Sequence, residues 1–269
     1  MAHLSKTLLL FFIITLLTTT LATVTNAANK PKPKPKNMVN IVLVHGAIAD
    51  GSSWSGVIPY LQAAGHYVLA VQQPLTSIDD DVAKVKVALG TIKSGPIVLV
   101  GHSFGGLVIT QAGHNNANIS SLVYVAAFAP DEGESVADLG KNYKPLPSNQ
   151  NFVPDSAGRL TLPQKLFLKY FCPDVDHKVA EVMAVAQGPC DAARFGYKSG
   201  PAAWKEHPSY YVVAENDQII QPEMEAFFAQ RMKAKKTIKV PSSHAVLVSH
   251  PKEVADIILE AAKAAKAAN

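Results

Sequence analysis

Six short apolar runs, rich in β-branched residues, recur between residues 40 and 240 and are separated by polar or glycine-containing segments. Runs of this length are typical of strands that are buried on both faces of a parallel sheet. The predicted strands are Asn40–Val44, Tyr67–Val71, Ile97–Val100, Leu122–Val125, Tyr210–Ala214 and Thr237–Val240.

Segments with helical spacing lie between most of these runs. They are Ser55–Ala64, Asp79–Leu89, Leu107–Gly113, Pro222–Lys233 and, at the C-terminal end, Pro251–Ala268. Strands that alternate with helices predict a parallel sheet joined by right-handed crossovers. We therefore predict an α/β fold with a mostly parallel six-stranded sheet, helices on both faces, and ligand binding at the carboxyl ends of the strands.

One long region, from about Asp131 to Ala203, breaks this alternation. It begins as a proline-rich loop and continues with two segments of helical pattern, Leu162–Phe171 and Asp176–Ala186. Because it falls between the fourth and fifth predicted strands, we expect it to form a small helical cap over the binding edge of the sheet. The cap then belongs to one domain covering residues 38–269.

The first 27 residues have the order of an export signal. Lys6 is followed by the apolar run Leu8–Leu17 and then by small residues up to Ala27. This order predicts a cleaved signal peptide, since the apolar run is shorter than the ~20 residues that span a bilayer; an uncleaved anchor is the alternative. Residues 28–37 repeat Lys-Pro and predict an extended tether. We expect the mature protein to be secreted or periplasmic.

The basic charge of the chain comes from its N-terminal part. The whole chain carries 25 Lys and Arg against 21 Asp and Glu, a net charge of +4. Lys6 and the four lysines of the tether account for this excess, and the remainder has 20 basic against 21 acidic side chains. The folded domain therefore lacks the basic surplus that would favour a nucleic-acid partner.

Both cysteines, Cys172 and Cys190, fall within the predicted cap. In an exported protein, two cysteines this close in sequence favour a disulfide. The alternative is a pair of separate buried thiols. We expect the disulfide.

The strongest chemical signal is Gly101-His102-Ser103-Phe104-Gly105, which follows a predicted buried strand and precedes a predicted helix. A G-x-S-x-G segment at such a junction is typical of a nucleophile elbow, in which a tight turn exposes the serine hydroxyl above the sheet. The new helix also directs its free N–H groups toward the same place. Ser103 is the predicted nucleophile.

Acyl transfer from a serine needs two backbone N–H donors aimed at the developing oxyanion. One donor is predicted at Phe104, the residue after the nucleophile. The other is predicted at Ala47, in the loop after the first strand, where Gly46 allows the backbone to approach closely. We assign His45 a structural role in ordering that loop.

The serine also needs a base and an acid that orients the base, and in this order of elements the acid and then the histidine follow the serine. His244 lies directly after the last strand and is the predicted base; His250 abuts Pro251 and fits a helix end. Asp217, a few residues past the fifth strand, is the predicted acid, whereas Glu215 fits a surface role. Neither a metal nor a cofactor is implied, because no His/Cys cluster has ligand spacing and no dinucleotide motif follows the first strand.

Residues 40–269 resemble the α/β-hydrolase superfamily. The resemblance is carried by Val42–Ala47 with Trp54, by Leu61–His66, by Gly101–Gly106 and by Ala126–Pro130. It points to the branch of plant methylesterases and hydroxynitrile lyases and, through Trp204-Lys205 and Ser243-His244-Ala245, to bacterial esterase-like members of that branch. It implies the triad Ser103, Asp217 and His244, with Ala47 and Phe104 as oxyanion donors.

The resemblance implies a serine esterase that cleaves a small hydrophobic carboxylic ester or related acyl compound, without a cofactor. Two alternatives stay open. One is hydroxynitrile-lyase or cofactor-free peroxidase chemistry on the same triad, although Ala245 stands where those lyases use a lysine. The other is a ligand-binding or sensor protein with little turnover.

Overall fold

The computed structural model describes residues 38–267, with side chains described up to residue 265. The predicted signal peptide (1–27) and tether (28–37) lie outside the described residues. Within residues 38–267, no helix combines the length and the apolar character needed to cross a membrane.

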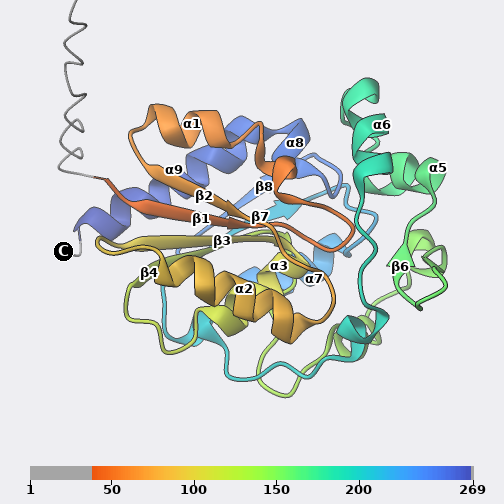
Figure 1. Cartoon of the computed structure of the whole chain (residues 1–269), viewed down its shortest axis with the longest axis horizontal. Helices are drawn as coiled ribbons and strands as arrows, with labels where there is room; N and C mark the ends of the chain where they lie inside the picture. Colours follow the sequence, from red (N-terminus) through yellow and green to blue (C-terminus); the bar gives the residue numbers. More distant parts are fainter. Residues whose placement is uncertain (1–37, 268–269) are drawn as a thin grey trace, which may run out of the picture. The chain divides into compact units, whose positions relative to one another are not determined.

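Six parallel strands form the central sheet, in the order β2-β1-β3-β4-β7-β8 (Figure 1). Their bounds are β1 Asn40–Val44, β2 Tyr67–Val71, β3 Ile97–Ser103, β4 Ile119–Ala127, β7 Ser209–Ala214 and β8 Lys236–Val240. The predicted six-stranded parallel sheet is confirmed. Strands β3 and β4 are longer than predicted because pairing continues through Gly101 and Ser103, which are opposite Tyr124 and Ala127.

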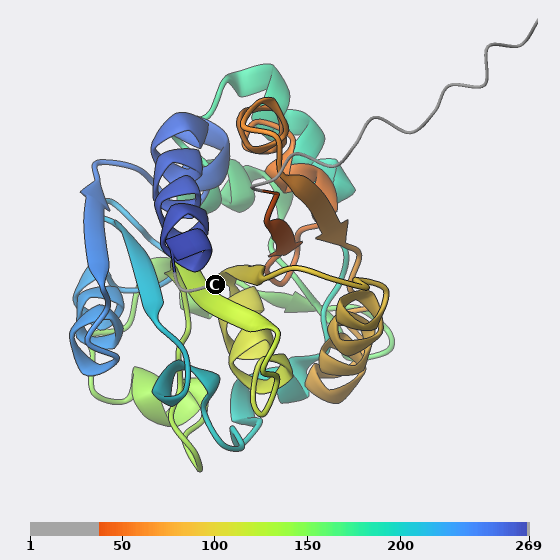
Figure 2. The same cartoon turned by 90° about the vertical axis from the view of Figure 1, so that its left-hand side faces the viewer.

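Helices cover both faces of the sheet (Figures 1 and 2). One face carries α2 (Ile78–Gly90), α3 (Phe104–Ala112) and α7 (Pro222–Arg231); the other carries α1 (Ile58–Ala63), α8 (Val246–Ser249) and α9 (Pro251–Ala267). Alternate side chains of a strand point to opposite faces, so Val42 packs into the first core and Ile41 into the second. The helix bounds lie within a few residues of the predicted ones, except that the first helix is preceded by a separate 3₁₀ turn η1 (Gly51–Trp54).

The segment between β4 and β7, called the cap below, folds into short elements, of which β6, α5 and α6 lie together at one end of the sheet (Figure 1). In chain order they are α4 (Val136–Gly140), η2 (Pro147–Gln150), β5 (Val153–Pro154), β6 (Leu160–Thr161), α5 (Gln164–Leu166), η3 (Phe167–Phe171), α6 (His177–Ala186), η4 (Ala192–Gly196) and η5 (Ala203–Lys205). The predicted helix over residues 162–171 is in fact one turn of α-helix followed by the π-helical η3. Asp176 caps α6 instead of belonging to it, because its carboxylate accepts the N–H groups of Lys178 and Val179.

The expected disulfide is wrong: Cys172 and Cys190 are separate buried thiols. Cys190 is fixed by two backbone hydrogen bonds to Leu160, of 2.7 and 3.0 Å. The Cys172 thiol lies at the end of η3 and donates to the Phe167 carbonyl oxygen at 3.8 Å. Each sulfur therefore has its own place in the packing, and proximity in sequence did not bring them together.

The two thiols should be unreactive in the native protein and countable once it is unfolded. Burial raises the pKa of Cys172 to about 12 and also raises the pKa of Cys190, so little thiolate is present at neutral pH. Without reductant, a thiol reagent should react slowly with the native protein and titrate two thiols in denaturant. Absence of titratable thiol in the denatured, unreduced protein would show that Cys172 and Cys190 do form a disulfide.

Candidate active site

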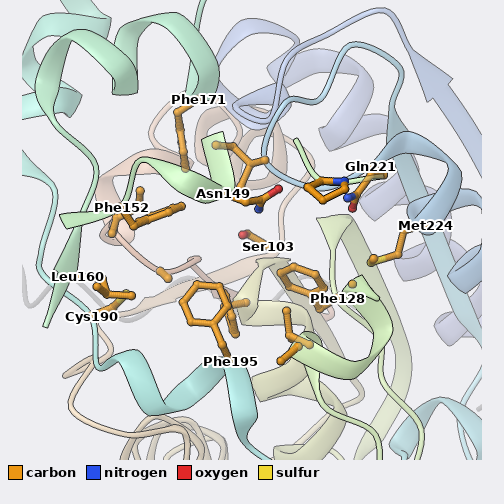
Figure 3. A pocket seen from close by; sticks show the side chains of 18 residues that line it. Ser103, Phe128, Asn149, Phe152, Leu160, Phe171, Cys190, Phe195, Gln221 and Met224 are labelled. Atoms are coloured by element: carbon orange, nitrogen blue, oxygen red, sulfur yellow. The ribbon is translucent and has the colours of Figure 1, made fainter. Parts of the chain in front are cut away.

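Ser103 occupies the turn that joins β3 to α3. Its backbone has φ 55° and ψ −126°, a strained conformation for a residue with a side chain. The turn is tight enough that a Cβ on Gly101 would lie 2.5 Å from the Gly105 carbonyl oxygen, and one on Gly105 would lie 2.6 Å from that of His45. The predicted elbow geometry is thus present, and it places Ser103 in the wall of a cavity (Figure 3).

His244 and Asp217 form a buried pair at the carboxyl edge of the sheet. His244 lies in the loop after β8, and its Nδ1 is 2.5 Å from Oδ2 of Asp217, in the loop after β7. The other oxygen, Oδ1 of Asp217, accepts the N–H groups of Ile219 and Ile220 at 2.6 and 3.0 Å. These donors fix the carboxylate, so that it accepts a hydrogen bond from Nδ1–H of His244, and Nε2 is left with a free lone pair. Among the described residues, Nε2 of His244 has no hydrogen-bond partner.

The elbow itself holds the His244 loop. Nε2 of His102, the residue before Ser103, donates to the backbone oxygen of His244 at 2.9 Å, and the two rings lie 4.7 Å apart. Burial, and then the charge of His244, keep the pKa of His102 well below its usual value, so His102 stays neutral. The structure therefore brings Ser103, His244 and Asp217 to one place.

The predicted oxyanion donors also lie at this place. Ala47 and Phe104 both line the cavity beside Ser103. Phe104 begins α3, so its N–H has no partner within the helix. His45 orders the loop before Ala47, since it donates from Nδ1 to the Gly46 carbonyl at 2.8 Å and accepts the Gln73 N–H on Nε2 at 3.0 Å.

The competing candidates lie outside this arrangement. Glu215 is exposed, and its backbone N–H continues the pairing with Val240. His250 ends α8 next to Pro251, the first residue of α9, and its Nδ1 contacts the Ser249 hydroxyl at 3.0 Å. Their positions agree with the surface and helix-end assignments made from the sequence.

The cavity above Ser103 has a volume of about 360 Å³ and is lined by 18 residues (Figure 3). Five phenylalanines dominate the lining: Phe104, Phe128, Phe152, Phe171 and Phe195. Apart from Ser103, its polar side chains are Asn149 and Gln221, and within the described part of the chain none of the 18 is charged. A charged ligand would lose its hydration here without a compensating ion pair, so the cavity suits a neutral, mostly apolar molecule.

The cap is hydrogen-bonded to the loop that carries His244. The sequence pattern did not indicate this contact. Asp174 accepts the Ser242 hydroxyl and the Ser243 N–H, both at 2.9 Å, as well as the Ser243 hydroxyl. The carbonyl oxygen of Phe171 accepts the Ala245 N–H at 3.1 Å, and its ring lies 4.8 Å from the His244 ring. A single acid in a loop belongs to no repeating sequence pattern, so only the folded structure shows that Asp174 supports the His244 loop.

Replacing Asp174 by alanine should lower kcat by about 10- to 100-fold and change KM less, because small misplacements of a catalytic group are costly. The loss follows from the freed Ser242–Ser243 backbone next to His244. Steady-state kinetics on an ester checks it. Asp176→Ala is the matched control: it removes the cap of α6 and should cost about 1 kcal/mol of stability while leaving kcat unchanged. Equal kcat values for the two variants would contradict the assignment.

A second buried contact joins the cap to the rest of the domain. Arg194 of η4 is almost fully buried and lies 3.3 Å from Asp81 of α2. It also donates to the carbonyl oxygens of Leu75 and Asp191, both at 3.0 Å. The Leu75 and Asp81 contacts hold the end of the cap, beside the cavity residue Phe195, against the loop after β2.

A serine on a β3–α3 elbow beside a buried His–Asp pair is the arrangement of the α/β hydrolases. Residues 41–257 match the model of the alpha/beta hydrolase family, and the protein belongs to that family. The superfamily predicted from the sequence is thereby confirmed, and relatives named methylesterase and hydroxynitrile lyase confirm the predicted branch.

Relatives of the chain include enzymes of several named activities. A carbendazim hydrolyzing esterase of Nocardioides sp. (strain SG-4G) is 30% identical over 246 residues, which cover 81% of this chain and 98% of that protein. An alpha-hydroxynitrile lyase of Arabidopsis thaliana is 25% identical over 244 residues, covering 81% and 94%. The crystal structure of polyneuridine aldehyde esterase has a TM-score of 0.72 at 20% identity and covers 83% of this chain and 98% of its own.

Proposed function

We propose that this protein hydrolyses small, neutral, hydrophobic carboxylic esters, with Ser103 as nucleophile, His244 as base and Asp217 as the acid that orients the base. The observation that carries the proposal is the uncharged, phenylalanine-lined cavity with Ser103 in its wall, next to the His244–Asp217 pair. Relatives named as esterases, among them the carbendazim hydrolyzing esterase and methylesterase 2 of Arabidopsis thaliana, support the reaction class.

In the first half of the reaction, Nε2 of His244 takes the Ser103 proton and the serine oxygen attacks the ester carbonyl carbon. The carbonyl oxygen becomes an oxyanion, which the N–H groups of Ala47 and Phe104 stabilise. The intermediate then expels the alcohol, which receives the proton from His244, and leaves the acyl group on Ser103. Asp217 stabilises the imidazolium that forms in between.

In the second half, water attacks the acyl-enzyme while His244 removes its proton. The same two N–H groups stabilise the second oxyanion, and Ser103 leaves with the proton returned by His244. The products are the carboxylic acid and the free enzyme. The buried Asp217 carboxylate, held by the Ile219 and Ile220 N–H groups, keeps the proton on Nδ1 of His244 throughout, so that only Nε2 gains and loses a proton.

A substrate panel on the purified protein tests the proposal. Neutral aryl and alkyl esters should turn over many times per enzyme, whereas esters with a charged acyl group should be poor substrates because the cavity offers no ion pair. Lactones and cyanohydrins in the same panel test the alternatives. Cleavage of cyanohydrins alone would favour a lyase, and stoichiometric product with tight ligand binding would favour a sensor.

We further propose that the protein is exported, as the order of residues 1–27 predicts. Protein recovered from the medium or the periplasm should begin near Ala28, after a small-residue cleavage site. Mass spectrometry of the intact exported protein checks this. Material that still begins at Met1 or Ala2 would contradict cleavage.

A further inference from the structure

A second acid, Glu225, is buried in helix α7 close to the end of β7. Its side chain is fully inaccessible to solvent. One carboxyl oxygen, Oε2, accepts the N–H of Ala214 at 2.9 Å. The other, Oε1, has no hydrogen-bond donor among the described residues. A buried carboxylate oxygen without a hydrogen-bond donor costs free energy, so an ionised Glu225 would be destabilised at this place.

Asp217 is the acid that interacts with Glu225, through its charge and through a hydrogen bond between the two side chains. Both are held at Ala214, since the Asp217 N–H donates to the Ala214 carbonyl oxygen at 3.2 Å while Glu225 accepts the Ala214 N–H. Tyr211 is the other titratable neighbour, and its hydroxyl is engaged with the backbone of Ala127. His244 is bonded to the same Asp217 carboxylate, through Oδ2.

Asp217 and Glu225 are both buried and interact with each other, so they cannot both be ionised without a large electrostatic cost. Asp217 is the better stabilised of the two as a carboxylate, because it accepts two backbone N–H groups and a hydrogen bond from His244. Glu225 accepts a single N–H. Burial, followed by the charge of Asp217 and the hydrogen bond to it, raises the pKa of Glu225 well above its usual value.

We infer that Glu225 is a neutral carboxylic acid that donates its O–H to the Asp217 carboxylate and thereby positions the acid of the triad. Oε1, the oxygen without a donor, carries the proton, and Oε2 keeps its bond to Ala214. The Asp217 carboxylate then accepts hydrogen bonds from the Ile219 and Ile220 N–H groups, from His244 and from Glu225. His244 is paired with the single negative charge of Asp217, because Glu225 carries none. This inference rests on the proposed function of Ser103, Asp217 and His244.

The protonation state can be measured without any substrate. An unfolded Glu ionises above a pH of about 4.3. If the folded protein keeps the proton, its stability falls as pH rises above that value, because the native state binds the extra proton. Glu225→Gln removes this dependence, so the melting temperature of the variant relative to wild type should rise between pH 5 and pH 8. A difference that stays constant over this range would overturn the neutral assignment.

The positioning role is tested by kinetics on the full-length protein. Glu225→Gln keeps a donor for Asp217 and should retain kcat within about threefold. Its acidic limb of the kcat/KM profile should stay within about 0.3 pH unit of wild type, whereas loss of a real negative charge would move that limb to lower pH. Glu225→Leu removes the donor and should lower kcat at least about tenfold with KM nearly unchanged.

Glu223→Leu is the matched control, since Glu223 is on the same helix but exposed, and it should leave kcat at the wild-type value. Equal kcat values for Glu225→Leu and Glu225→Gln would overturn the inference, as would a shifted acidic limb in Glu225→Gln. If Glu225→Leu does not fold, the two readouts of Glu225→Gln decide. If wild type hydrolyses no ester, the proposed function fails, and the melting series still shows whether Glu225 is neutral.

Discussion

Ser103→Ala should abolish labelling by a fluorophosphonate and reduce ester turnover to background, a loss of about 10⁶-fold if the triad acts as a unit. The reason is that Ser103 is held at φ 55° on the elbow, in the cavity wall beside the His244 loop. Labelling followed by mass spectrometry of the modified peptide, together with ester kinetics, measures both effects.

Ser120→Ala is a suitable control for this result. Ser120 lies on β4, donates its hydroxyl to the Ile97 carbonyl oxygen, and does not line the cavity. Its removal should leave labelling and turnover intact. Full turnover by Ser103→Ala would rule out the serine mechanism altogether, and a label on any other residue would move the nucleophile.

Asp217→Asn should lower kcat by about 10⁴-fold, as the corresponding change does in a serine protease with the same triad. An amide at this position offers its N–H₂ to Nδ1 of His244 and so favours the wrong tautomer, with the proton on Nε2. His244→Ala should be nearly as inactive as Ser103→Ala, because the three residues work together. Ester kinetics on the purified variants measure all of these losses.

His250→Ala separates the two histidines that follow the last strand. His250 contacts Ser249 at a helix end and does not line the cavity, so this variant should retain turnover within about tenfold of wild type. An inactive His250→Ala together with an active His244→Ala would show that the base has been misassigned.

The parts of this protein that sequence pattern predicts well are those in which a local signal and the global fold agree. Each strand of the sheet is an apolar run because both of its faces are covered, and β1 shows this by packing Ile41 and Val42 into different cores. The elbow is equally local, since strand, tight turn and helix are consecutive. The pairing of His244 with Asp217 was predictable because parallel strands bring the loops at their carboxyl ends together.

The parts that could not be predicted depend on contacts between segments far apart in the chain. Glu225 resembles an ordinary acid in the first turn of a helix, where the dipole favours negative charge at the surface, and only the packing of α7 on β7 buries it. The π-helical turn at Phe167–Phe171 and the separate thiols of Cys172 and Cys190 likewise follow from the packing of the cap. No periodicity along the chain encodes that packing.

The hydrogen bonds between the cap and the His244 loop limit which caps this fold can accept, and therefore which new substrate specificities can evolve on it. Asp174 and Phe171 belong to the segment that also shapes the cavity, yet they bond to Ser243 and Ala245 on either side of the base. A cap transplanted from a relative would therefore bring a foreign set of supports for His244. Chimeras, whether made in the laboratory or by recombination, should remain active only when residues 171–174 and 242–245 are inherited from the same parent.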